Sequence, residues 1–212
     1  AIGHSTLAAN VTSDGDGTIA IGYQTLAAMT TGQYNVAVGY EAMLVETQGD
    51  RNTAVGYHAL KDQNGVNGEV HNTAVGYIAG HNITTGKSNT VLGSEAGTSL
   101  TTASQSVCIG RTAGNTISTG NQNIAVGFGA MSNNTVTGDN NISIGTNAGD
   151  NLTAGKLNVA IGYVAGDAIN TGQQNVALGF EALSTATTVT GATALGAGAL
   201  GDGNVTSDAN YT

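Results

Sequence analysis

The stretch Asn-Thr-Ala-Val-Gly-Tyr occupies residues 52–57 of this 212-residue chain and occurs again at 72–77. Looser copies, each a short apolar segment that ends in glycine, recur along the whole sequence. The glycines that end the copies are Gly3, Gly22, Gly39, Gly56, Gly76, Gly93, Gly110, Gly127, Gly145, Gly162, Gly179 and Gly196. Eight of the eleven intervals between them are 17 residues long, so the sequence is a tandem repeat with a 17-residue unit.

The two positions before each glycine carry side chains of unlike size. The position directly before it holds Ile, Val or Leu in every copy, and the position before that holds Ala in nine of twelve. Alternation of large and small residues, without a 3.6-residue period, is typical of a strand and not of a helix. A unit this short cannot bury its apolar face alone, so the copies must stack. We therefore predict an all-β fold, a parallel β-solenoid of about twelve 17-residue coils that forms one domain over residues 1–212.

The composition excludes several other classes of protein. Glycine is abundant, with 33 residues, but Pro is absent, which excludes collagen and proline-rich linkers. Charged residues make up 9% of the chain, where about 25% is usual. A net charge of −9 disfavours nucleic acid and anionic membranes as partners. No apolar run approaches the ~20 residues of a membrane span, so we expect no membrane insertion in this segment.

Both faces of the predicted strands are apolar, although a thin coil has only one interior. The small residues lie on one face and the Val, Ile and Leu residues on the other. The face that does not line the interior must meet another chain, because soluble monomers rarely expose so large an apolar stripe. We therefore expect this chain to associate with further copies of itself, while the spacing leaves open which face points inward.

Two columns of the repeat predict ladders along the stack. Asn amides stacked one above another could hydrogen-bond along the axis, as in cross-β arrays. The Asn ladder consists of Asn35, Asn52, Asn72, Asn89, Asn123, Asn141, Asn158 and Asn175. The residue after the glycine is aromatic in seven copies, Tyr23, Tyr40, Tyr57, Tyr77, Phe128, Tyr163 and Phe180. These rings are a candidate receptor-contact stripe, since aromatic faces suit sugar rings, or else a ladder that packs against the turn or a neighbouring chain.

Few residues resemble a catalytic or metal site. Asp14 and Asp16 lie in an Asp-Gly-Asp-Gly segment, which makes them weak candidates for Ca²⁺, but the bidentate Glu of an EF-hand loop is missing. The four histidines lack metal-ligand spacing, and Cys108 replaces Ala in the small column. Neither a phosphate-binding glycine motif nor a nucleophile beside a base is present. The sequence predicts no enzyme, no cofactor and no bound metal.

The repeat core resembles a known family. The pattern Ser/Asn-x-Ala-aliphatic-Gly, seen at 35–39 and 158–162 and with Cys for Ala at 106–110, resembles the YadA-like head repeats of trimeric autotransporter adhesins over nearly the whole chain. That resemblance implies a left-handed parallel β-roll, three chains around a common axis and adhesion at a cell or virus surface. The 17-residue unit is longer than in that family. The Asn-Thr-Ala-Val-Gly-Tyr variant is similar to repeats of bacteriophage tail fibres.

These observations predict an extracellular segment of a longer fibrous chain, located on a virion or a bacterial cell. Our leading interpretation is a homotrimeric structural and adhesive segment of a phage tail fibre that contributes to host attachment, with a cell-surface glycan or protein as receptor. The alternative within the same class is the head of a bacterial trimeric surface adhesin. An ice-binding β-solenoid is a remote alternative, because the Thr residues cluster in turns without a sustained Thr-x-Thr file.

Overall fold

The computed structural model describes residues 1–9, 16–64 and 68–201. Within these residues the fold is all-β and contains no helix, which confirms the predicted class. The strands are β1 (Ile19–Ile21), β2 (Val36–Val38), β3 (Gly49–Asp50), β4 (Thr53–Val55), β5 (Gly68–Glu69), β6 (Thr73–Val75), β7 (Thr90–Leu92), β8 (Val107–Ile109), β9 (Ile124–Val126), β10 (Ile142–Ile144), β11 (Val159–Ile161), β12 (Val176–Leu178) and β13 (Thr193–Leu195).

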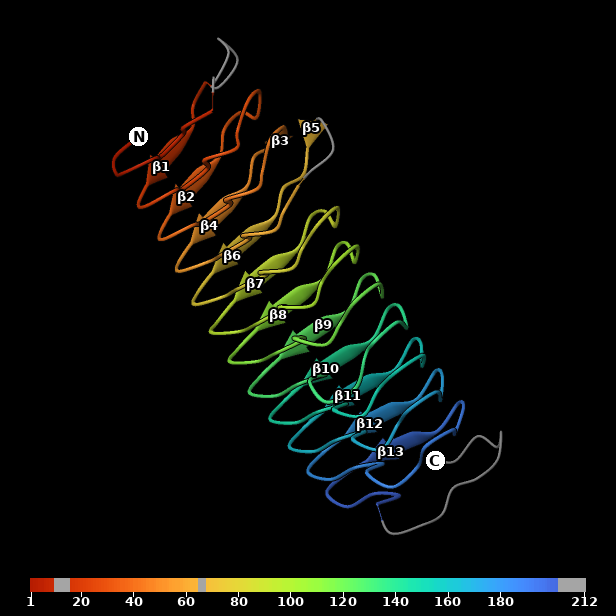
Figure 1. Ribbon diagram of the computed structural model, residues 1–212. Helices are drawn as coiled ribbons and strands as arrows, with labels where there is room; N and C mark the ends of the chain where they lie inside the picture. The colour runs from red at the N-terminus through yellow and green to blue at the C-terminus, as the bar shows by residue number, and fades with distance from the viewer. Residues whose placement is uncertain (10–15, 65–67, 202–212) are drawn as a thin grey trace.

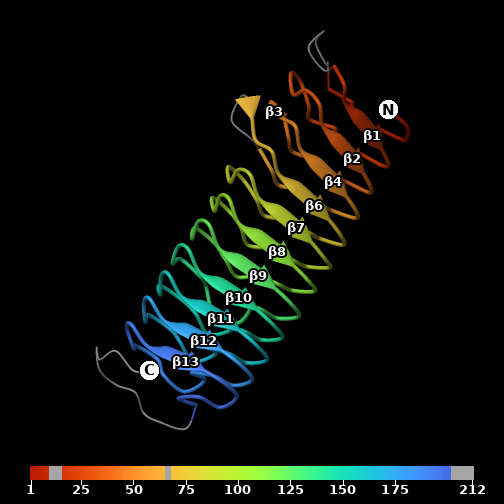
Figure 2. The same ribbon diagram turned by 180° about the vertical axis from the view of Figure 1, so that it is seen from behind.

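The strands stack as a parallel β-solenoid. Eleven of them form one sheet in chain order, from β1 to β13 without β3 and β5, and equivalent residues of successive repeats pair directly, for example Ala160 with Ala177. The eleven strands define about ten turns, fewer than the twelve coils predicted, because the first copy contributes only a bridge between Ile2 and Ile21. Figures 1 and 2 show the coils as a straight stack with β1 and β13 at opposite ends.

The small residue of each strand points into the coil. The middle residue is buried in all eleven strands of the large sheet, whereas the first and third are half-buried or exposed. A 17-residue coil is thin, so only small side chains fit between the sheet and the returning chain. The structure thereby settles what the sequence leaves open: the Ala column lines the interior, and the Val, Ile and Leu columns face outward.

The glycine after each strand turns the chain into the corner of the coil. Along the stack these glycines have φ between 119° and 144°, a range that L side chains rarely adopt. From Gly3 to Gly179, a Cβ would also lie within 3.0 Å of the carbonyl oxygen of the equivalent glycine in the next coil. Glycine is therefore required there both by backbone conformation and by close approach of two coils.

The core is filled by complementary large and small residues in each coil. Four residues after the corner glycine stands either Leu or Met, as at Leu60, or Gly, as at Gly80. Where it is Gly80, a Cβ would meet the end of Ile83 at 3.0 Å and the end of Leu60 in the preceding coil at 3.0 Å. In most coils the bulky side chain thus comes from only one of the two positions, although Leu26 and Met29 of one coil are both buried. Either arrangement keeps the narrow interior close-packed.

The longer repeats depart from the regular coil at the turn opposite the corner. In the 20-residue repeat, Gly68 and Glu69 form β5, which pairs with β3 in a separate two-stranded sheet. In the interval 133–139, Val136 forms a bridge with Ile117. Most of the interval 10–16 lies outside the described residues.

Candidate functional site: the outward sheet face and its aromatic border

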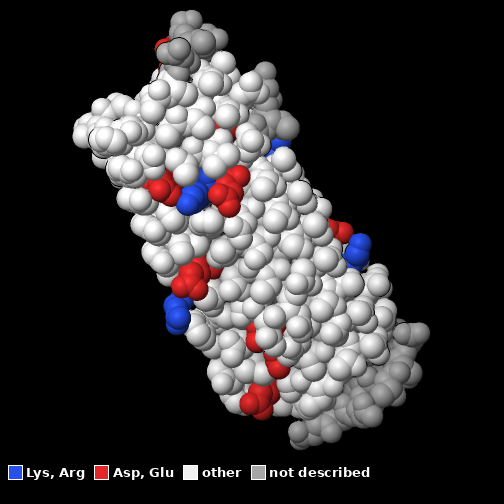
Figure 3. Space-filling view, viewed as in Figure 1, with Lys and Arg blue, Asp and Glu red and all other residues white. Residues whose placement is uncertain are grey.

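The outward face of the large sheet is a continuous apolar surface. Its two columns hold only Ile, Val, Leu and Thr in all eleven strands. The most exposed members include Ile19 at 50%, Leu92 at 47% and Leu195 at 72%. Neither column contains an acidic or basic residue, although the chain carries 14 acids. The charged side chains visible in Figure 3 instead form small groups separated by uncharged surface. We call these two columns the outward face.

An aromatic ladder borders the outward face, just beyond the corner glycines. Tyr23, Tyr40, Tyr57 and Tyr77 stack in consecutive coils with centroid separations of 5.0, 5.3 and 5.4 Å and interplanar angles of 14°. His4 extends the stack, 5.5 Å from Tyr23. The centroid separations are larger than those of rings in full face-to-face contact, so the rings are offset and each covers only part of the next. The four tyrosines remain 41–50% exposed.

The candidate stripe is interrupted in the second half of the rod. Ser94 and Arg111 follow Tyr77 at the same position, and the Arg111 guanidinium lies 5.4 Å from the centre of the Phe128 ring. Tyr163 and Phe180 form a separate pair at 5.4 Å. The structure thus brings four of the seven predicted rings into one unbroken ladder, Tyr23 to Tyr77, which we call the Tyr ladder.

A polar cluster lies against the Tyr ladder and was not identified from the sequence. Lys61 Nζ lies 2.8 Å from Glu41 Oε2, and this pairing lowers the pKa of the Glu41 carboxyl. His58 Nε2 lies 3.0 Å from the same oxygen without hydrogen-bond geometry, and the His58 ring stacks on Tyr57 at 3.8 Å. Burial lowers the pKa of His58, which disfavours its charged form. The cluster could have been expected because Glu41, His58 and Lys61 follow the corner glycines of adjacent coils in the sequence.

The Asn ladder lies inside the coil, where all eight members are buried. Each side-chain oxygen accepts the backbone N–H of the equivalent residue in the next coil at 2.9–3.1 Å. Seven side-chain nitrogens also donate to a carbonyl of the next turn at 2.7–2.9 Å. Direct bonds from amide to amide join four pairs, for example Asn158 to Asn141 at 3.1 Å. The ladder is therefore a structural spine, and Ser106 takes the place of Asn in one coil.

The buried carboxylate of Glu46 accepts backbone hydrogen bonds beside the longest repeat. In a regular coil, the backbone N–H groups of Thr84 and Thr85 donate to the carbonyl of Thr101 in the next coil. The coil that follows Glu46 has a 20-residue interval instead of 17. There, the backbone N–H groups of residues 47, 48 and 49 donate to Glu46 Oε1 at 2.9, 3.0 and 2.7 Å. Gln63 Nε2 donates to the other oxygen, Oε2, at 2.7 Å, so both carboxylate oxygens have partners.

We expect Glu46→Leu to destabilise the protein by about 2–3 kcal/mol, although Met, Ile or Leu fills this core position in other coils. The substitution removes the acceptor of three backbone N–H groups, and a leucine cannot replace it. Met29→Leu, at the equivalent position of the preceding coil, should cost less than about 1.5 kcal/mol because it nearly conserves volume. Urea unfolding of both variants measures the difference. Equal stability of the two would contradict a structural role for the carboxylate.

The remaining predicted residues do not assemble into a site. Asp14 lies outside the described residues, and Asp16 is exposed, where its backbone carbonyl accepts the N–H of Tyr34. Among the described residues, no group of three His, Cys, Asp or Glu side chains is placed to hold a metal ion. Cys108 is fully buried in the inward column, and burial raises its thiol pKa to about 12. This thiol has the environment of a core residue and not that of a nucleophile.

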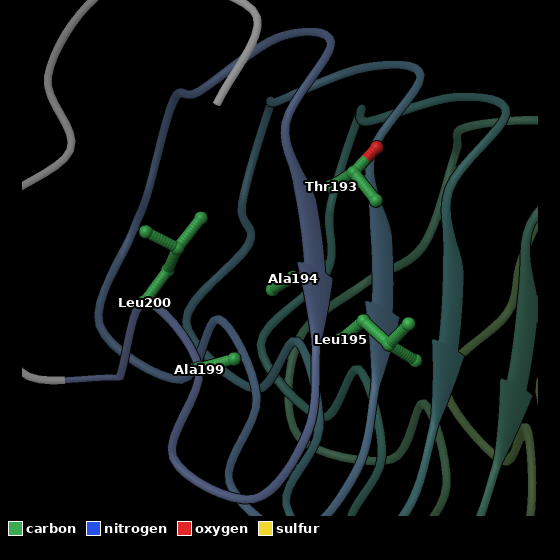
Figure 4. A pocket seen from close by; sticks show the side chains of 5 residues that line it. All are labelled: Thr193, Ala194, Leu195, Ala199 and Leu200. Atoms are coloured by element: carbon green, nitrogen blue, oxygen red, sulfur yellow. The ribbon is translucent and has the colours of Figure 1, made fainter. Parts of the chain in front are cut away.

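One cavity of about 440 Å³ lies at the end of the stack, lined by Thr193, Ala194, Leu195, Ala199 and Leu200. Figure 4 shows these side chains around the last strand, β13. β13 has β12 on one side and no further strand of the large sheet on the other. The cavity is therefore the open end of the described stack of coils and contains no titratable group.

No helix of the described residues is long and apolar enough to cross a membrane. No family model, no curated protein and no solved structure matches the chain.

Proposed function

We propose that this chain is a structural and adhesive segment of an extracellular fibre, a phage tail fibre that contributes to host attachment, and that it works as a homotrimer of left-handed β-rolls. The observation that supports this proposal is the uncharged outward face. Eleven strands at ~4.8 Å make it roughly 50 Å long, and three residues at ~3.3 Å each make it about 10 Å wide, so its area is about 500 Å². A stable protein interface covers about 800 Å² on each partner, so the outward face would supply the larger, apolar part of an interface of that size.

The regular spacing of the outward face favours another copy of this chain as its partner. Its apolar side chains recur once per coil along the rod. A second rod of the same sequence has the same rise per coil, so its side chains can interdigitate along the whole length, whereas an unrelated globular surface has no such period. The trimer, the handedness and the tail-fibre assignment come from the resemblance to YadA-like heads and phage fibres.

The geometry gives less support to an ice-binding surface. Thr hydroxyls at the turns are used within the stack: those of Thr30, Thr84 and Thr101 donate to a carbonyl of the next coil at 2.9–3.1 Å. A face that orders water needs its hydroxyls free. The outward face is mainly aliphatic and carries Thr in only a few strands.

We expect light scattering to give a solution mass near 63 kDa, three times the chain mass of 20.9 kDa. A charge at the centre of the outward face, Val126→Lys, should dissociate the assembly, because burying an unpaired ammonium costs several kcal/mol. Thr102→Lys, at an exposed turn, is the matched control and should keep the wild-type mass. A stable wild-type monomer at micromolar concentration would overturn the proposed trimer.

A further inference from the structure

The Tyr ladder and the polar cluster differ from the rest of the rod because they occupy only a few coils. In a solenoid, the fold requires each coil to provide the same inward residues, glycine corner and spine. The stacked tyrosines end at Tyr77, and among the described residues of the second half, up to 201, Glu41, His58 and Lys61 have no equivalent cluster. The later coils form the same sheet without these features. Stacking of coils therefore does not require them.

The two features together form a narrow strip along the edge of the rod. Four rings at one ring per coil give a length of about 20 Å and an area of a few hundred Å². Next to the rings, Lys61 offers ammonium donors and Glu41 offers an acceptor. His81 lies 5.6 Å from His58 between ring centroids, and Asp62 lies 3.6 Å from His81, which extends the polar side by one more coil. The strip thus has an aromatic side and a polar side.

The strip is too narrow for a folded protein, whose stable interface covers about 800 Å² on each partner. Its chemistry suits a linear polymer that carries both apolar C–H surface and many hydroxyl groups. Sugar hydroxyls can donate to Glu41 and accept from Lys61, while partly exposed rings can pack against the C–H surface of the sugar. The net charge of −9 opposes an anionic polymer, and the Glu41–Lys61 pair adds no net charge.

We propose that the Tyr ladder, together with Glu41, His58 and Lys61, binds a neutral glycan chain that lies parallel to the rod axis. This inference rests on the proposed function in host attachment and names the class of receptor. The contact of His58 with Tyr57, 3.8 Å between ring centroids, joins the ladder to the polar side. Three copies around a shared axis would present three such strips.

The test uses wild-type protein on immobilised neutral hexasaccharides of glucan, mannan and galactan type, with heparin as the anionic probe. We expect binding to at least one neutral chain, weakened about tenfold or more by Tyr57→Ala and by Lys61→Met. Tyr163→Ala is the matched control, because Tyr163 has the same place in its coil and is 50% exposed, but belongs to the separate pair with Phe180. Its affinity should stay within about twofold of wild type.

Four outcomes would overturn the inference: no neutral glycan bound, heparin alone bound, equal loss of affinity in Tyr163→Ala, or dissociation of the trimer by Tyr57→Ala. The last would place the Tyr ladder between chains. Light scattering on every variant separates this inference from the proposed trimer. A monomer that binds neutral glycans would disprove the trimer alone, and a trimer that binds none would disprove the glycan site alone.

Discussion

Gly162→Ala is expected to destabilise the folded protein by about 2–6 kcal/mol, because the added methyl group meets both a backbone conformation and a close approach that only glycine fits. Gly162 has φ +139, and a side chain held in this region costs about 1–3 kcal/mol. The added Cβ would also collide with the backbone of Gly179, whose carbonyl carbon would be 2.6 Å away. Backbone of the next coil would have to move, and overpacking of this kind adds about 1–3 kcal/mol or more.

Gly166→Ala, four residues later in the same coil, separates this close approach from the general effect of losing a glycine. Gly166 has φ +60, a conformation that Leu60 adopts at the equivalent position of another coil. Its Cβ would meet only side chains, at 3.0 Å from Ala160 and 3.1 Å from Ile169. We expect a cost of about 1–2 kcal/mol. Urea unfolding at equal chain concentration compares the two variants. Equal losses of unfolding free energy would show that the close contact between successive corner glycines does not determine the stability of the stack.

The fold could be predicted from the sequence because its repeat makes each structural demand visible many times. Gly56 or Ala54 alone says little, but the same pair at a 17-residue interval indicates one coil stacked on another. The direction of the strand faces could not be predicted, since Ala54 and Val55 are both apolar. Only the thickness of the coil decides it, and that depends on how the returning chain packs against the sheet.

The left-handed backbone of the corners was also hidden from sequence reasoning. Leu60 and Gly80 occupy equivalent positions with φ 50° and 61°, yet residues such as Leu rarely adopt positive φ. The column that holds Leu, Met or Gly is visible in the sequence, but such a pattern fits either a strand or a corner. Glycine in five of the twelve copies was the available signal for a left-handed position.

The candidate site was predicted only in part. The aromatic column and its interruption at Ser94 and Arg111 were evident in the sequence, but whether consecutive rings stack depends on side-chain rotamers. Glu46 shows a further limit. Its acidic side chain in a mainly apolar column, next to the longest repeat, indicated a local departure from the regular coil. The three backbone N–H groups that donate to it could not be inferred from composition.

Asn158→Ala is expected to cost about 3–5 kcal/mol, because one side chain serves several buried groups. Its oxygen accepts the N–H of Asn175 at 3.1 Å, and its nitrogen donates to the carbonyl of Gly172 at 2.8 Å. Alanine leaves both backbone groups buried without these partners, and each such loss costs about 1–3 kcal/mol. The side-chain amide of Asn175 also loses an acceptor, because its nitrogen donates to the side-chain oxygen of Asn158.

Asn158→Ser tests whether the hydrogen bonds or the packed volume accounts for this loss. Serine already stands in the spine at Ser106, where its hydroxyl oxygen accepts the N–H of Asn123 at 3.3 Å. The Ser variant should therefore recover about 1–2 kcal/mol relative to Ala, although serine also leaves space unfilled. Hydrogen exchange of the backbone N–H of Asn175 gives a local measure. We expect this exchange to be fast in the Ala variant, intermediate in the Ser variant and slow in wild type. Equal unfolding energies and equal exchange for Ala and Ser would mean that volume, and not the hydrogen-bonded spine, holds neighbouring coils in register.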